Sequence, residues 1–186
     1  MRIAILGWGS LLWEGTEFDR WHEPWQDDGP RLKLEFSRIS ASRSGALTLV
    51  IDEEHGSPTT VAWCLSKRAG VDDAVCDLRA REGTTIEKIG RSTVTRQETR
   101  GEPENAIIAW ARTKNLDYIV WTALKSNFPK KMNQPFSVVA AIAYLKTLDP
   151  AGKAKAAEYV WRAPMFIKTD LRSALQGEPW FSEEGR

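Results

Sequence analysis

Apolar residues in the first third of the chain fall in short runs that alternate with polar residues or stop at turn-forming ones. Runs of this kind, bounded by glycine, proline, serine or aspartate, are typical of β-strands. They predict strands at residues 3–6, 32–42, 46–51 and 60–65. Residues 7–31 contain many turn-forming residues and are predicted to be loop and irregular structure.

The apolar spacing changes to a helical period near residue 71. Val71, Val75 and Leu78 recur at i, i+4 and i+7 and therefore share one helical face. Gly83 stands where a glycine commonly ends a helix, because glycine adopts the left-handed conformation at little cost. The pattern predicts a helix that begins near Val71 and ends just before Gly83.

The second half of the chain is richer in helical patterns. Helices are predicted at 137–148 and from Asp149 to about Arg162, with Asp149 as N-cap and Pro150 at the first helical position. Because strands dominate the first third and helices follow without strict alternation, the fold class is predicted to be α+β.

Four other segments give weaker signals. Residues 116–124 are predicted to form a buried strand, and part of 84–103 fits an edge strand. Residues 106–112 fit either a strand or a short helix, whereas 126–134 are predicted to be a loop.

Length and charge limit the classes of protein. The 186 residues are expected to form a single domain over 1–186, with a mobile tail from about residue 176. Lys and Arg total 26 against 25 for Asp and Glu, so no basic excess points to nucleic acid or an anionic membrane as a partner. No stretch approaches the roughly 20 apolar residues of a membrane span or resembles a signal peptide. A cytoplasmic protein is expected.

Metal-binding residue types are scarce. Cys64 and Cys76 form no C-x-x-C pair, and His22 and His55 are the two histidines of the sequence. A multi-histidine or cysteine metal site is hard to build from this set, so no metal site is expected.

The stretch AILGWGSLLWEG at 4–15 places two glycines directly after a predicted strand. The third glycine of the dinucleotide-binding motif is replaced by Leu12, and no helical pattern follows. The Gly-Lys-Ser/Thr of a P-loop is absent, and Ser10 lacks the flanking glycines of a nucleophile elbow. A nucleotide-binding domain therefore ranks behind the two hypotheses given at the end of this section.

Two interpretations of this turn remain. Glycines on both sides of Trp8, followed by Ser10, let several backbone N–H groups point into one concave site that binds a carboxylate or an oxyanion. The other interpretation is an ordinary turn at the end of a strand, which this stretch alone favours.

A carboxylate continues the apolar stripe of the helix that starts at Val71. Glu82 follows Leu78 by four residues and returns to within about 20° of Val71 around the helix. Partial burial and the negative end of the helix dipole would both raise its pKa, as a proton-transferring carboxylate requires. If the helix ends by Arg81, Glu82 is instead a solvated acid paired with an arginine.

The two features together resemble the γ-glutamylcyclotransferase superfamily. GWGSLLW at 7–13 is similar to its Y-G-S-L glycine loop, and the Arg-Glu of DLRAREG at 77–83 to the catalytic glutamate at its helix end. Order and spacing resemble the ChaC-like bacterial branch. The stretch SRISASRSGALTLVID at 37–52 resembles the intervening hairpin, and TTVAWCLS at 59–66 resembles the strand before the glutamate helix. The resemblance covers about residues 2–90 well and is looser from 105 to 170, where DYIVWTAL fits a later strand.

This resemblance implies a mixed, barrel-like β-sheet with flanking helices. It also implies a reaction in which the α-amine of a γ-glutamyl group attacks its own γ-carbonyl, releasing 5-oxoproline and a free amine without metal or organic cofactor. Glu82 is then the general base and acid. The substrate-binding loop consists of Gly7, Trp8, Gly9, Ser10 and Leu11.

One loop residue departs from the family pattern, and four residues outside the loop are secondary candidates. Trp8 stands where the family loop usually has tyrosine, which keeps an aromatic wall and removes a phenol. Arg38 and Arg43 could bind a substrate carboxylate or could be solvated strand ends. Trp121 and Thr122 could line the pocket or belong to a core strand.

The leading hypothesis is therefore an amide-cleaving acyltransferase or lyase that acts on a small γ-glutamyl substrate. The alternative is a non-catalytic protein of the same fold whose glycine loop holds a small carboxylate.

Overall fold

The computed structural model describes residues 1–95 and 101–181, and the chain folds into two compact units. Unit 1 consists of residues 1–32 and 60–124, and unit 2 of residues 33–59 and 125–186. Each unit is thus built from two segments that are distant in the sequence. The prediction of a single domain over 1–186 stays a prediction.

Unit 1 contains a four-stranded sheet in the order β5-β1-β7-β6. Strand β1 pairs antiparallel with β5 and parallel with β7, and β6 pairs antiparallel with β7. The strands are β1 (Ile3–Gly7), β5 (Ala62–Leu65), β6 (Ile89–Thr93) and β7 (Tyr118–Thr122). The mixed α+β class predicted from the sequence is confirmed.

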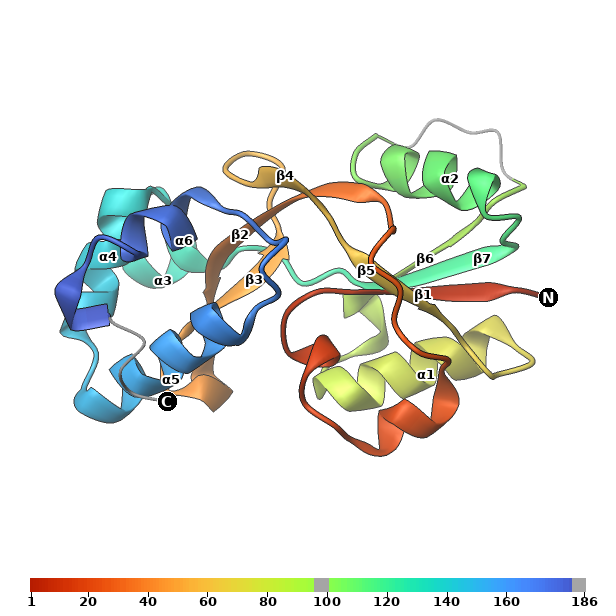
Figure 1. The fold of residues 1–186 in the computed structure, drawn as a ribbon, viewed down its shortest axis with the longest axis horizontal. Coiled ribbons are helices and arrows are strands. Elements are labelled where there is room, and N and C mark those ends of the chain that lie inside the picture. The colour runs from red at the N-terminus through yellow and green to blue at the C-terminus, as the bar shows by residue number, and fades with distance from the viewer. Residues whose placement is uncertain (96–100, 182–186) are drawn as a thin grey trace. The chain divides into compact units, whose positions relative to one another are not determined.

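Helices cover both faces of this sheet, with α1 (Val71–Glu82) on one and α2 (Glu104–Thr113) on the other (Figure 1). All five residues of β1 are buried, because neither face of the strand meets solvent. The core under α1 brings together Ile3 and Ile5 of β1, Val120 of β7, and Val75 and Leu78 of the helix.

The described strands form two open sheets, so the barrel implied by the resemblance is not present among residues 1–95 and 101–181. The outer edge of β5 is occupied by an irregular segment rather than by another strand. Backbone bridges join His22 to Ser66 and Gln26 to Trp63, and the amide of Gly29 donates to the carbonyl of Val61 at 3.0 Å. An edge paired in this way is not available for closing a barrel.

Unit 2, as far as it is described, contains a three-stranded sheet in the order β3-β2-β4, accompanied by four helices. Its strands are β2 (Arg31–Ile39), β3 (Leu47–Ile51) and β4 (Ser57–Thr60). Its helices are α3 (Phe128–Met132), α4 (Val138–Thr147), α5 (Pro150–Arg162) and α6 (Asp170–Leu175). The register between β2 and β3 shifts between Glu35 and Arg38, which marks an irregularity in the ladder.

Most predicted elements are confirmed where local signals were strong. Helix α1 ends at Glu82, and Gly83 follows in the left-handed conformation with φ 58°. At the start of α5, the carboxylate of Asp149 accepts a hydrogen bond of 2.7 Å from the amide of Gly152. The ambiguous segment 106–112 lies within α2, and β6 is the strand expected within 84–103.

Two further predictions, for 60–65 and for 126–134, were wrong. The run 60–65 belongs to two strands of different sheets, because Val61 breaks the ladder and donates its amide to the carbonyl of Pro30. The segment 126–134, predicted as loop, contains the short helix α3, in which Pro129 lies in the first turn where its missing N–H is tolerated.

The C-terminal segment contains structure that the sequence did not signal. Helix α6 and the 3₁₀ helix η5 (Pro179–Phe181) follow α5, and the ring of Phe181 is buried. The rest of the predicted mobile tail, residues 182–186, lies outside the described residues, as do residues 96–100 of the segment 84–103. In the part of the chain that is described, no helix is long and apolar enough to cross a membrane.

Candidate functional site

The two glycines of the predicted loop are required for different reasons. Gly9 begins the 3₁₀ helix η1 (Gly9–Leu12) and has φ 68°, a conformation that residues with a Cβ rarely adopt. Gly7 ends β1, and a Cβ atom on it would lie 2.5 Å from Cζ3 of Trp25. The indole of Trp25 therefore occupies the space beside Gly7.

The remaining loop residues are packed by their side chains. Trp8 and Leu11 are buried, and Leu11 belongs to the core cluster under α1. Ser10 is half-buried, and its carbonyl accepts the amide of Glu14 at 3.0 Å. The loop thus comprises the last residue of β1, Trp8 and the first three residues of η1.

Glu82 is the last residue of α1, so the helical periodicity inferred from the sequence extends to it. Val75 and Leu78 of the same stripe are buried against the sheet, and Glu82 is half-buried. The interpretation in which the helix ends by Arg81 is excluded.

Arg81 joins the helix end to the glycine loop. Its Nη2 atom donates to the carbonyl of Ser10 at 3.1 Å and lies 3.4 Å from the carboxylate of Glu14. The Arg81 side chain is only 10% exposed, so solvent screens its ion pair with Glu14 less than it screens an exposed surface pair. The structure thereby brings together two motifs that lie some 70 residues apart in the sequence. Arg81 is the arginine of the Arg-Glu motif in DLRAREG, but the sequence patterns gave it no role of its own, because arginines usually point to solvent from a helix end.

The carboxyl ends of β1 and β7 meet at the same edge of the sheet. Ile5 pairs with Val120 in a parallel register, and continuing this register places Gly7 beside Thr122. Helix α1 runs in the same direction as β1 (Figure 1). Leu78 of the helix and Val120 of the strand belong to the same core cluster. Glu82 follows Leu78 by one helical turn of four residues, and Thr122 follows Val120 by two residues on the same face of the strand, so both lie further toward this edge.

Thr122 carries an unusual polar group. It is 8% exposed, and its Oγ1 atom has no hydrogen-bond partner among the described residues. A buried hydroxyl without a partner costs about 1–3 kcal/mol. Such a group is a place where a bound molecule can restore the missing hydrogen bond.

The other secondary candidates lie elsewhere. Trp121 points to the opposite face of β7 from Thr122 and packs on Gly90, where a Cβ atom would collide with its indole. Arg38 and Arg43 belong to unit 2. Arg38 donates to the carbonyl of Lys125 at 2.9 Å, and burial lowers its pKa. The guanidinium of Arg43 lies 4.9 Å from the ring centroid of Tyr159.

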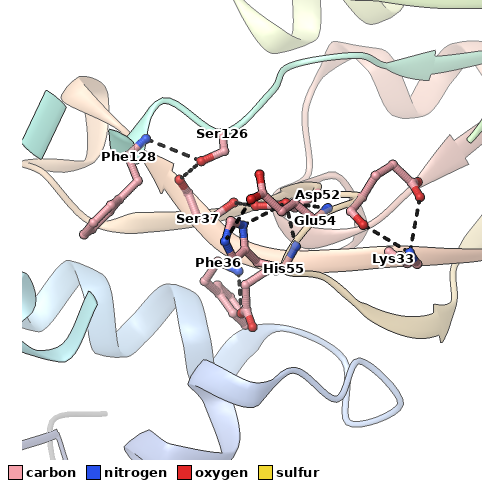
Figure 2. Close-up of polar contacts among 10 residues, drawn as sticks. Lys33, Phe36, Ser37, Asp52, Glu54, His55, Ser126 and Phe128 are labelled. Atoms are coloured by element: carbon pink, nitrogen blue, oxygen red, sulfur yellow. Dashed lines mark hydrogen bonds and ion pairs between the residues drawn. The ribbon is translucent and has the colours of Figure 1, made fainter. Parts of the chain in front are cut away.

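A second polar cluster, which the sequence patterns did not signal, surrounds Asp52 in unit 2 (Figure 2). Ser37 donates its hydroxyl to Asp52 Oδ2 at 2.7 Å. The other carboxylate oxygen accepts the amides of Glu54 at 3.2 Å and His55 at 3.0 Å. We call Ser37, Asp52, Glu54 and His55 the Asp52 turn.

The Asp52 turn contains serine, histidine and aspartate, but their hydrogen bonds do not connect them in the way that nucleophilic catalysis needs. The Ser37 hydroxyl donates to the carboxylate, whereas an activated serine donates to a histidine base. The imidazole Nδ1 of His55 lies 3.5 Å from Oδ1 of Asp52, the oxygen that does not bind Ser37. Asp52 therefore fixes the turn between β3 and β4.

Comparisons with known proteins leave the family open: no protein-family model matches the chain, and no curated protein matches it significantly. In the described part of the chain, no three His, Cys, Asp or Glu side chains gather as a metal site would require.

Proposed function

We propose that this protein is a γ-glutamylcyclotransferase-type enzyme that converts a γ-glutamyl amine or peptide to 5-oxoproline and a free amine. The observation that carries the proposal is the Arg81–Ser10 hydrogen bond, which fixes the glycine loop beside the helix end where Glu82 lies. The proposal includes the finer fold assignment, a γ-glutamylcyclotransferase-like domain in an open-sheet form, and a cytoplasmic location.

The chemistry needs one proton acceptor that later returns its proton. Glu82 takes a proton from the substrate ammonium, and the freed amine nitrogen attacks the γ-carbonyl carbon to form the lactam C–N bond. The original amide C–N bond then breaks as the proton on Glu82 passes to the leaving nitrogen, and the attacking nitrogen, which still carries two hydrogens, gives one of them to Glu82 to leave the neutral lactam. This second proton leaves with the amine product, so that Glu82 ends the cycle as a carboxylate. Because nucleophile and electrophile belong to one molecule, the enzyme chiefly has to fold the substrate and exclude water.

The other proposed roles follow from position. The backbone N–H groups of the glycine loop stabilise the oxyanion of the tetrahedral intermediate, and Trp8 forms an aromatic wall. The hydroxyl of Thr122, buried and without a partner among the described residues, donates to a polar atom of the γ-glutamyl group. The contacts of Trp121 are those of a core residue, and we assign it no contact with substrate.

The test is an assay for 5-oxoproline with glutathione, γ-glutamyl dipeptides and γ-glutamyl amines as substrates. Glu82→Gln should lower kcat roughly 10²–10⁴-fold with little change in stability, because a general acid–base group contributes about that much. Glu87→Gln, which removes an exposed carboxylate from the following 3₁₀ helix, is the matched control and should retain full activity. The absence of 5-oxoproline from every substrate, with folded protein, would refute the proposal, as would a fully active Glu82→Gln.

A second candidate is the non-catalytic carboxylate-binding protein. The packing of Trp25 against Gly7 favours it, since this contact explains one loop glycine without a reaction. In that case γ-glutamyl compounds would raise the melting temperature but yield no 5-oxoproline.

A further inference from the structure

A pocket of about 370 Å³ in unit 1 lies outside the proposed active site. It is formed between the 3₁₀ helix η2 (Glu17–Trp21) and the last turns of α1. Its main lining residues are Glu17, Phe18, Trp21, Asp77, Ala80 and Arg81. None belongs to the glycine loop, and Glu82 projects about 100° further around α1 than Arg81 does. The volume is near the lower end for small-molecule sites and suits a ligand the size of an amino acid.

The aromatic wall of this pocket is held in place. The hydroxyl of Thr16 accepts the amide of Phe18 at 3.3 Å, and the Asp19 carboxylate accepts the amide of Thr16 at 3.0 Å, which together cap η2. The guanidinium of Arg68 lies 3.4 Å from the ring centroid of Trp21. Arg68 also binds Asp77 through two hydrogen bonds of 2.7 and 2.9 Å, which ties the wall to α1.

One aromatic residue of the pocket lining, Trp21, remains partly exposed. Its side chain is 38% exposed although it is fixed by stacking, and the ring of Phe18 beside it reaches into the core. An ordered, partly exposed indole at a concave site is typical of a surface that covers an apolar ligand.

Arg81 provides the charged end of the pocket. Both contacts described above, to Ser10 and to Glu14, use its Nη2 atom. Within the described residues this leaves the Nε and Nη1 donors for a ligand, and a guanidinium binds a carboxylate well.

The opposite charge is also present. Glu17 lines the pocket with an exposed carboxylate, which pairs with Arg20 at 3.0 Å in a contact between two largely exposed side chains. Such a pair is weak and can be shared with an incoming ammonium group. The lining therefore offers a cation for a carboxylate, an anion for an ammonium group, and an aromatic surface between η2 and α1.

We propose that this pocket binds a free α-amino acid with a large apolar side chain. The ligand carboxylate binds Arg81, its ammonium group binds Glu17, and its side chain packs on Phe18 and Trp21. The site is separate from the proposed cyclotransferase reaction and requires no turnover, so the two proposals can fail independently.

Isothermal titration calorimetry on the full chain tests the ligand class with four probes: L-phenylalanine, phenethylamine, 3-phenylpropionate and glycine. Phenethylamine lacks the carboxylate, 3-phenylpropionate lacks the ammonium group, and glycine lacks the apolar side chain. L-Phenylalanine should bind at least roughly tenfold more tightly than each of the others, a difference of about 1.4 kcal/mol. Absence of L-phenylalanine binding, or equal binding of any other probe, would overturn the proposal.

Three variants locate the site. Ala80→Leu fills the pocket from an exposed helix position, and Arg81→Gln removes the guanidinium, so each should weaken L-phenylalanine binding about tenfold or more. Arg79→Gln removes an equal charge from an exposed position on the same turn that does not line the pocket, and should leave binding unchanged. Because Arg81→Gln also loosens the glycine loop, Ala80→Leu decides the outcome. Unweakened binding by Ala80→Leu would place the ligand elsewhere and refute the site.

Discussion

The carboxyl edge of the unit 1 sheet and the Asp52 turn of unit 2 differ in how completely their polar groups are paired. Asp52 accepts three hydrogen bonds, one from the Ser37 hydroxyl and two from backbone amides. At the unit 1 edge, the buried hydroxyl of Thr122 has no partner among the described residues. The carboxylate of Asp52 is thus paired within the fold, whereas the hydroxyl of Thr122 can still form a hydrogen bond with a ligand.

Other buried charges of unit 2 follow the pattern of Asp52. Glu35 on β2 is fully buried, and its two carboxylate oxygens accept the amides of Phe36 at 2.7 Å and Leu171 at 3.3 Å. Arg172 donates to three backbone carbonyls, those of Ala163, Pro164 and Ile167. These polar groups of unit 2 thus stabilise turns and helix ends.

The comparison teaches that residue types alone do not mark a site. Serine, histidine and aspartate meet in the Asp52 turn, where the carboxylate holds a backbone turn in place. A threonine and an arginine at the edge of unit 1 are chemically plainer, yet they retain capacity for a ligand. Unsatisfied buried groups are costly, so where they persist they point to binding.

The largest predicted effect is on the Asp52 turn. Asp52→Ala should lower the free energy of unfolding by about 3 kcal/mol, because it leaves one hydroxyl and two amides without their acceptor. Asp52→Asn keeps an acceptor oxygen and should cost about 1 kcal/mol. Urea denaturation measures both. Equal losses in the two variants would show that the carboxylate serves through its charge instead.

The glycine loop should respond to substitution more moderately. Gly7→Ala should destabilise the protein by about 2 kcal/mol, because the new methyl group overlaps the Trp25 ring. Gly9→Ala should cost about 1 kcal/mol, the strain of a left-handed alanine. Thermal or urea unfolding distinguishes the two causes, since adding Trp25→Leu should rescue Gly7→Ala and not Gly9→Ala. Rescue of both, or of neither, contradicts this explanation of the loop.

A matched pair of hydroxyl deletions tests the comparison directly. Ser37→Ala should destabilise by about 1 kcal/mol, because Asp52 loses a donor. Thr122→Val should leave stability unchanged or raise it by up to about 1 kcal/mol, since the deleted hydroxyl has no partner among the described residues. If Thr122 binds substrate as proposed, KM for the γ-glutamyl substrate rises in Thr122→Val alone. Destabilisation by Thr122→Val would show that its hydroxyl is satisfied in solution.

The most gradual effect is the pH dependence that Glu35 should produce. Burial raises the pKa of Glu35 above its ordinary value of 4.5, despite hydrogen bonds that oppose the shift. The folded state therefore holds this proton more tightly than the unfolded state. The associated stability is complete below pH 4.5 and is lost as the pH rises through the folded-state pKa.

Glu35→Gln provides the reference because it cannot titrate. Urea unfolding at several pH values should show wild type losing stability relative to this variant as the pH rises above 4.5. A stability difference that stays constant with pH, or that grows in favour of wild type, would contradict the burial effect.

The sequence by itself determined the elements whose signals are local. Strand β1, helix α1 with Gly83 after its last residue, and the Asp149 cap of α5 all depend on apolar periodicity or on hydrogen bonds within about four residues. The position of Glu82 on the buried stripe of α1 followed from the same periodicity.

Only the tertiary structure decided what depends on residues distant in the chain. Val61 separates β4 from β5 because its backbone bonds to the segment at 29–30, and Gly7 must be glycine because Trp25 lies against it. Arg81 reaches the loop through the carbonyl of Ser10, and Thr122 is buried, without a partner among the described residues, at the end of a parallel strand pair. Such contacts form between segments that the fold alone brings together, so no local pattern of residues encodes them.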